Sequence, residues 1–112
     1  MLFRSIHQLE HARSQHPYHP RILNDLGTAY ERSGRADSAV SCYQTALRYC
    51  PGLNESKLNL AAAFFNSGNT DAAFTTIQTI RKPEALKGRE LKDYLDFRTV
   101  IVRTMEEKKG SE

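Results

Sequence analysis

The sequence predicts an all-α fold, an array of antiparallel helix pairs that ends in a C-terminal capping helix. The main observation is an internal repeat with a period of 34 residues, in which Leu26-Gly27 recurs as Leu60-Ala61. In addition, apolar residues within each unit recur at the three- to four-residue spacing of an α-helix. Such a period is typical of stacked helical repeats, in which each unit leaves an apolar face for its neighbour to cover. Further pairs in this register are Tyr30 and Phe64, Gly34 and Gly68, Ala39 and Ala73, Tyr43 and Ile77, and Ala46 and Ile80.

The N-terminal segment is expected to form one helix within residues 3–16, in a single domain of residues 1–112. Leu9, Ala12 and Pro17 occupy the places that apolar residues and a proline take in the second helix of the next unit. Two interpretations remain open: this helix is half of a repeat whose first helix lies outside the sequence, or it is an N-terminal cap.

The first complete unit covers residues 20–53. Its first helix is expected to begin at Pro20, because proline suits the first helical position, and to end before Gly34. Its second helix is expected to begin near Asp37, a predicted N-cap, and to end before Pro51, since the residue before a proline is pushed out of the helical region.

The second unit covers residues 54–83 and follows the same plan. Asn54 is the predicted N-cap of its first helix, and Gly68 marks the break. Thr70 or Asp71 begins the partner helix, and Pro83 closes the unit. The apolar residues expected on that partner helix are Ala73, Phe74, Ile77 and Ile80.

A capping helix is expected over residues 84–107, beginning near residue 84 or 88, and the tail 108–112 is expected to fray. Its predicted apolar stripe consists of Leu91, Tyr94, Leu95, Ile101, Val102 and Met105.

Residues 20–53 contain a pattern of residue types at set offsets, namely a large residue, Leu-Gly, Tyr, Gly, Ala, an aromatic residue, Ala and Pro. They are Leu23, Leu26-Gly27, Tyr30, Gly34, Ala39, Tyr43, Ala46 and Pro51. With this pattern the segment resembles the tetratricopeptide repeat family, and only Leu23 departs from it, because Trp is common there. Residues 54–87 match less well, with Lys57, Ala61, Ile77 and Ile80 at pattern positions. The resemblance implies a right-handed α-α superhelix of antiparallel helix pairs.

The resemblance also implies a function, namely a protein–protein interaction module whose first helices line a concave groove for a partner peptide or helix. Lys92 of the capping helix is expected to add to this groove, and the partner is not identified. Phe65 has two interpretations, an anchor for an apolar ligand side chain or a residue covered by the C-terminal helix, and the second is favoured. The groove positions are Arg21, Asn24, Thr28, Glu31 and Arg32 in the first unit, and Leu58, Asn59, Ala62, Phe65 and Asn66 in the second.

An alternative function is structural, as a homodimer or as part of a longer repeat array that assembles through the C-terminal helix. Phe97, Val100, Ile101 and Val102 give that helix a broad apolar character, so one stripe can close the array while another faces a neighbour.

Chaperone-binding members of the family hold a terminal carboxylate with a clamp of Lys, Asn and Arg. Here Asn59 fits the middle position and Arg89 is a candidate cation of the third unit. Asn24 and Thr28 replace the first pair, however, and Asp93 falls where a cation is required. The clamp is therefore not expected.

The segment from His7 to His11 formally matches the H-x-x-E-H pattern of zinc proteases. Leu9 and Ala12 are expected to face inward, which places both histidines on the solvated side of the helix, so no metal site is predicted. No nucleophile elbow, phosphate loop or CxxC pair occurs either. We therefore expect neither a cofactor nor enzymatic activity.

Charge and cysteine content limit the remaining functional classes and the expected location. The net charge is +3, with a local basic concentration in residues 81–92 but no aromatic–basic ladder, so nucleic-acid binding is a weaker hypothesis. No apolar run approaches the ~20 residues of a membrane span, and no signal peptide is recognised. Cys42 and Cys50 lie about 12 Å apart along one predicted helix, beyond disulfide reach. Free thiols favour a reducing compartment, and we expect a cytoplasmic location.

Overall fold

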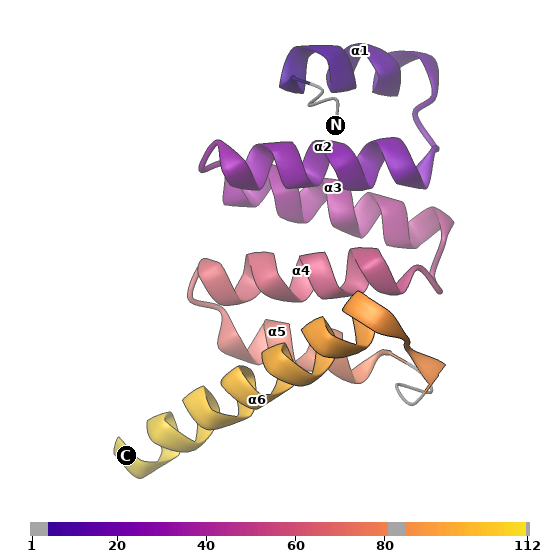
Figure 1. The fold of residues 1–112 in the computed structure, drawn as a ribbon. Helices are drawn as coiled ribbons and strands as arrows, with labels where there is room; N and C mark the ends of the chain where they lie inside the picture. Colours follow the sequence, from indigo (N-terminus) through magenta and orange to yellow (C-terminus); the bar gives the residue numbers. More distant parts are fainter. Residues whose placement is uncertain (1–4, 81–84, 112) are drawn as a thin grey trace.

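The computed structural model describes residues 5–80 and 85–111, which form six α-helices and no strand. Figure 1 shows an elongated stack of these helices, with overall dimensions of 48 × 30 × 27 Å. None of the described helices is both long and apolar enough to cross a membrane. The six helices, without any strand among the described residues, confirm the predicted all-α, repeat-like fold. The helices are α1 (Ile6–Gln15), α2 (Pro20–Arg32), α3 (Ala36–Tyr49), α4 (Asn54–Asn66), α5 (Thr70–Gln78) and α6 (Gly88–Ser111).

The two repeat units share one turn geometry. Helix α2 pairs with α3, and α4 pairs with α5. Gly34 and Gly68 end the first helix of each pair with φ of 82° and 88°, a left-handed conformation that favours glycine. The amide of the residue after each glycine donates to the carbonyl of Tyr30 or Phe64 at 2.8 Å. This is the Schellman arrangement, which satisfies carbonyls at the helix end and returns the chain antiparallel.

Helix α1 begins at Ile6, later than the predicted residue 3, and residues 1–4 lie outside the described part of the chain. A capping box fixes this start, because Ser5 Oγ accepts from the Gln8 amide while the Gln8 side chain accepts from the Ser5 amide. This cap was not predicted from the sequence.

Two predicted N-caps are wrong by one or two residues. Helix α3 begins at Ala36, so Asp37 lies in its first turn, where a carboxylate interacts favourably with the positive end of the helix dipole. Helix α4 begins at Asn54 itself, with Leu53 at the cap position. The start of α5 at Thr70 agrees with the prediction.

Helix α5 ends at Gln78, so Ile80 lies beyond the helix on which it was expected, although it is still buried. Lys57 reaches this end of α5 from α4, and its ammonium donates to the Thr79 carbonyl at 2.8 Å. A cation suits the negative end of a helix dipole. The apolar stem of Lys57 thus fills a position where the repeat pattern has a large residue.

Helix α6 continues to Ser111, so the predicted helix end at 107 is wrong, and residue 112 lies outside the described residues. No proline interrupts this segment, and Lys108 and Lys109 in the last turn complement the negative end of the helix dipole. At the other end, α6 begins at Gly88, the later of the two predicted starts, and residue 84 lies outside the described residues.

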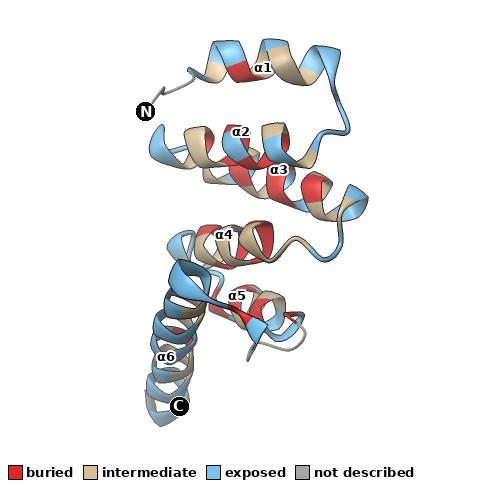
Figure 2. Ribbon diagram, turned by 45° about the vertical axis from the view of Figure 1, so that its right-hand side comes forward, coloured by how far each residue is buried: buried red, intermediate tan, exposed pale blue. Residues whose placement is uncertain are grey.

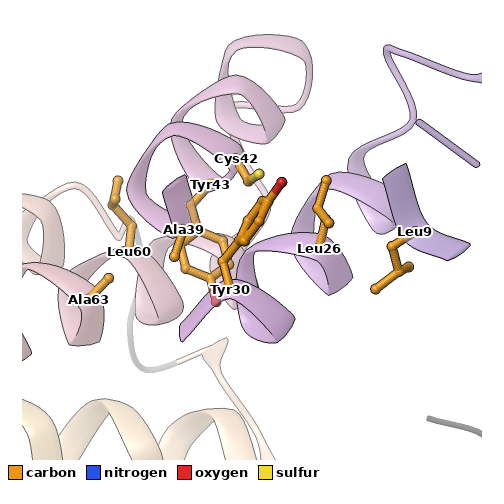
Figure 3. Close-up of a cluster of buried hydrophobic side chains, with 8 residues drawn as sticks. All are labelled: Leu9, Leu26, Tyr30, Ala39, Cys42, Tyr43, Leu60 and Ala63. Carbon is orange, nitrogen blue, oxygen red and sulfur yellow. The ribbon is translucent and has the colours of Figure 1, made fainter. Parts of the chain in front are cut away.

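Two buried clusters hold the stack together, and Figure 2 shows buried positions along the facing sides of the helices. The first cluster runs from α1 to α4 (Figure 3). Tyr43 and Ala39, both 0% exposed, lie at its centre, and Leu9 brings α1 onto it. The small Ala39 side chain lets α3 approach its neighbours closely enough to enclose the Tyr43 ring. The members are Leu9, Leu26, Tyr30, Ala39, Cys42, Tyr43, Leu60 and Ala63.

The second cluster joins α4 and α5 to α6, with Ile101 of α6 fully buried in it. The face of α6 in this cluster consists of Tyr94, Phe97, Ile101 and Met105. Leu95, expected in the apolar stripe, is instead 50% exposed, because it lies about 100° around the helix from Tyr94.

Both cysteines are free thiols, as predicted. Cys42 is buried in the first cluster, whereas Cys50 is half-buried at the end of α3. Burial raises the pKa of the Cys42 thiol, with the positive charge of Arg13 opposing the shift. The low thiolate population makes Cys42 a packing residue rather than a reactive one.

Candidate functional site: the face between α2 and α4

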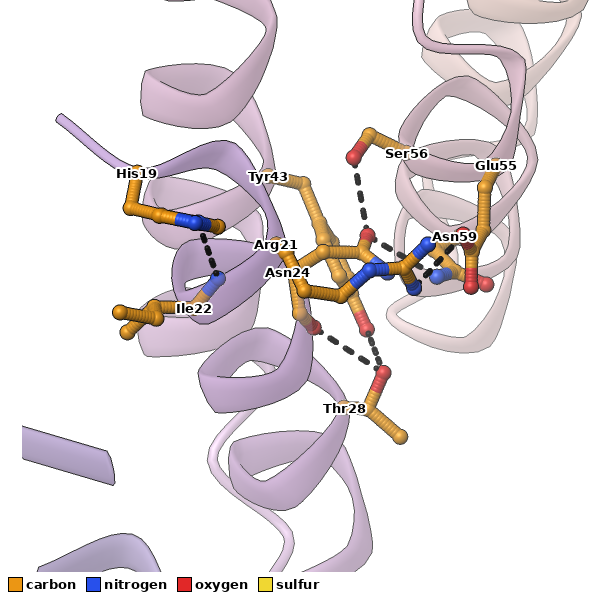
Figure 4. Close-up of polar contacts among 9 residues, drawn as sticks. All are labelled: His19, Arg21, Ile22, Asn24, Thr28, Tyr43, Glu55, Ser56 and Asn59. Atoms are coloured by element: carbon orange, nitrogen blue, oxygen red, sulfur yellow. Dashed lines mark hydrogen bonds and ion pairs between the residues drawn. The ribbon is translucent and has the colours of Figure 1, made fainter. Parts of the chain in front are cut away.

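A row of polar side chains joins α2 to α4, the first helices of the two repeat units (Figure 4). Its outermost contact is an ion pair of 2.9 Å between Arg21 of α2 and Glu55 of α4. Both side chains are substantially exposed, so this pair contributes little stability, but it neutralises the Arg21 charge. We define the α2–α4 face by Arg21, Asn24, Thr28 and Glu31 of α2 and by Ser56, Asn59, Ala62, Phe65 and Asn66 of α4.

Asn24 is buried, with 2% of its surface exposed. Its Oδ1 accepts from the Ser56 hydroxyl at 2.9 Å and from the Asn59 amide at 3.1 Å. Both donors belong to the next repeat unit, so Asn24 links the two units through its side chain. Asn24 was predicted to be a groove position, and in this structure its Oδ1 is engaged within the chain.

Glu31 and Thr28 are positioned by a residue from the other helix of their unit. The hydroxyl of Tyr43 in α3 donates to Glu31 Oε1 at 2.6 Å and lies 3.2 Å from the Thr28 hydroxyl. Burial of Tyr43, followed by its bond to Glu31, raises the pKa of its phenol far above the usual range. The phenol therefore stays protonated at neutral pH and remains a donor to the Glu31 carboxylate.

The α4 side of the face is less polar. Leu58, Ala62 and Phe65 are half-buried, and Asn66 is exposed at the end of the helix. The Phe65 ring meets the Phe97 ring of α6 edge-on, with centroids 5.5 Å apart. The favoured interpretation was that the C-terminal helix covers Phe65; the structure shows a ring contact with that helix and leaves Phe65 half-buried. Phe65 and Phe97 are both half-buried, so part of this aromatic pair remains accessible.

The expected cations do not gather into one cluster. The Lys92 ammonium lies 3.8 Å from the Asp96 carboxylate, and the Arg89 guanidinium lies 3.8 Å from the Asp93 carboxylate. Both cations therefore pair with acidic residues of their own helix. Arg32 is exposed at the last turn of α2. A carboxylate clamp built on Arg89 is thus opposed by Asp93.

Sequence reasoning missed two members of this site, the Ser56 hydroxyl and the Tyr43 hydroxyl. A signal for the second was present in the repeat register. The first unit has Tyr43 and Glu31. The second unit has Ile77 at the position equivalent to Tyr43 and Phe65 at the position equivalent to Glu31. A paired change from polar to apolar at two register positions indicates that the two side chains touch.

The histidines of the H-x-x-E-H pattern, His7 and His11, are both exposed, as predicted from the inward direction of Leu9. Glu10 turns towards α2 instead and accepts a hydrogen bond from the Tyr30 hydroxyl. That bond, together with burial, raises the pKa of Tyr30. Within the described residues, no group of three or more potential ligands is arranged to hold a metal ion.

The model of the tetratricopeptide repeat family matches residues 20–53, the unit that contains α2 and α3. No curated protein matches the chain.

Proposed function

From the membership of residues 20–53 in the tetratricopeptide repeat family, we propose that this chain binds a partner protein through the α2–α4 face. Repeats of this family are generally protein–protein interaction modules. The observation that carries the proposal is the preorganisation of Thr28 and Glu31, which a buried tyrosine holds in place before any ligand arrives. Side chains ordered in advance lose less conformational entropy on binding.

An extended segment or a helix of the partner suits this face. The face combines hydrogen-bonding groups on α2 with a partly exposed aromatic edge and a small alanine on α4. Polar groups of this kind fix orientation, and the apolar patch supplies buried area. The proposed role is binding without catalysis.

The test is a selection of random 12-residue peptides displayed on phage against the folded chain. We expect the selected peptides to lose about tenfold or more in affinity for Ala62→Gln, because the larger side chain occupies the centre of the face. The matched control is Ser41→Gln on the exposed surface of α3, which should bind as the wild type does. Peptides that bind Ala62→Gln and the wild type equally would place the binding surface elsewhere.

Self-association through α6 is a second candidate, favoured by a specific observation. Leu95 is 50% exposed, and the half-buried Leu91 and Val102 lie within about 40° of it around the helix. We expect a Leu95→Gln variant to shift the mass measured by light scattering from dimer to monomer at high protein concentration. A wild-type mass equal to the monomer at every concentration eliminates this candidate.

A further inference from the structure

We propose that the α2–α4 face selects a segment that carries a basic side chain three residues from a large apolar one. The basic group pairs with Glu31, and the apolar side chain packs on Ala62 and Phe65. This inference rests on the proposed function and adds the chemical class of the ligand. Its basis is the difference between the two repeat units at equivalent positions of one face.

The Glu31 carboxylate is the acidic half of this face. It is half-buried and accepts one hydrogen bond, from the Tyr43 hydroxyl, which leaves most of its acceptor capacity unused. Across residues 5–80 and 85–111, the ion pairs engage other acidic groups, namely Glu55, Asp93 and Asp96, and no cation pairs with Glu31. A fixed, partly desolvated carboxylate with no counter-ion among the described residues favours a lysine or arginine of a ligand, because charge-assisted hydrogen bonds are the stronger class.

The apolar half follows from the repeat register. Phe65 is 34 residues after Glu31, and Ala62 is 34 residues after Thr28, so α4 presents an apolar pair where α2 presents a polar one. The Phe97 ring of α6 contacts the Phe65 ring edge-on and restrains it. A half-buried aromatic ring backed by a second ring is a rigid surface for an apolar side chain.

The distance between the two halves sets the ligand spacing. Helices α2 and α4 meet at the Asn24–Ser56 bond, where an axis separation of about 10 Å is expected for two helices in contact. An extended chain advances about 3.3 Å per residue, so three residues span that distance. A ligand that crosses from α2 to α4 therefore places a basic and an apolar side chain at positions i and i+3, in either chain direction.

Selectivity against acidic ligands has a basis on the same face. Arg21 lies three residues before Asn24 in the sequence. Its guanidinium is neutralised by the Glu55 carboxylate, with 2.9 Å between the nitrogen and the oxygen. The Glu31 carboxylate places a negative charge at the C-terminal end of α2 that pairs with no described cation, although the whole chain carries a net charge of +3. Local charge decides which ligand group is held, since distant charges are screened at physiological salt.

The experiment measures the affinity of the phage-selected peptides and of synthetic versions in which the basic residue is replaced by glutamine. The protein variants are Glu31→Gln, which keeps an oxygen acceptor for Tyr43, and Asp25→Asn, which removes the same charge from an exposed position of α2. Circular dichroism checks that both variants fold.

We expect Glu31→Gln to weaken wild-type peptides about tenfold and Asp25→Asn to change affinity less than about twofold. The basic-to-glutamine peptide should also bind about tenfold more weakly, and it should lose nothing further with Glu31→Gln, because both changes remove the same pair.

Two results overturn the inference, and they differ in what they leave standing. If the peptides lose affinity for Ala62→Gln but not for Glu31→Gln, or if acidic peptides are selected, the face binds ligands but the ligand class is wrong. If Ala62→Gln has no effect, the proposed binding face fails together with the inference.

Discussion

Replacing Gly27 by alanine is expected to lower the free energy of unfolding by about 2 kcal/mol. A Cβ at this position of α2 lies 2.5 Å from Cε1 and 2.8 Å from Cζ of the Tyr43 ring. Tyr43 is 0% exposed and its hydroxyl bonds to Glu31, so a shift of the ring would have to displace its neighbours or strain this bond. Alanine is favoured over glycine in a helix by ~1 kcal/mol, so the overpacking must outweigh that gain.

Urea denaturation measures this loss, and Gly52→Ala is the matched control. No atom lies within 4 Å of a Cβ built at Gly52, so its replacement should change stability by less than about 0.5 kcal/mol. Equal stabilities for Gly27→Ala and the wild type would show that the Tyr43 ring can shift, contrary to the packing described here.

The second repeat unit supplies a rescue for the same variant. Where the first unit has Gly27 and Tyr43, the second has Ala61 and Ile77, both buried in one cluster. Tyr43→Ile in the Gly27→Ala background should therefore recover at least about 1 kcal/mol relative to the sum of the single changes. Tyr43→Phe should not rescue, because the clashing ring atoms remain.

The 34-residue register made the helix pairs predictable from sequence because it reports packing that both units share. Gly34 and Gly68 end their helices through the same turn, and Ala39 and Ala73 are both fully buried. Helix starts were less predictable, because caps depend on local hydrogen bonds. Ser5 and Asn69 are bonded as N-caps, whereas Asp37 and Asn54 have equally suitable side chains but lie inside their helices.

The contact between α2 and α4 was predictable from the repeat register, but the state of the side chains on these helices was not. Asn24 and Glu31 lie on α2 within two turns of each other, yet one is buried by Ser56 and Asn59 and the other is half-buried. Their difference arises from contacts between units, which a single helical pattern does not contain. The end of α6 was placed too early because residues 108–112 were expected to fray as a terminal tail. No proline follows residue 107 to stop the helix, and it continues to Ser111.

Because Asn24 links the two units, its substitution should lower the free energy of unfolding more than that of any other polar residue of this face. We expect Asn24→Leu to lower the free energy of unfolding by about 1–3 kcal/mol, because the Ser56 hydroxyl, which is 0% exposed, loses its acceptor. Leucine suits the helix and approximates the asparagine in size, and the second unit carries Leu58 at the equivalent position. The loss thus reports the unsatisfied hydroxyl rather than a helix defect.

A double-mutant cycle in urea separates the hydrogen bond from packing. Ser56→Ala removes the stranded donor, so the variant with both Asn24→Leu and Ser56→Ala should regain at least half of the loss caused by Asn24→Leu. Asn66→Leu, at an exposed position of α4, is the control and should stay within about 0.5 kcal/mol of the wild type. Strictly additive effects of Asn24→Leu and Ser56→Ala would mean that the two side chains do not act as a pair. The coupling between repeat units would then reside in the apolar cluster around Tyr43 and Leu60 alone, since that cluster also spans α2 to α4.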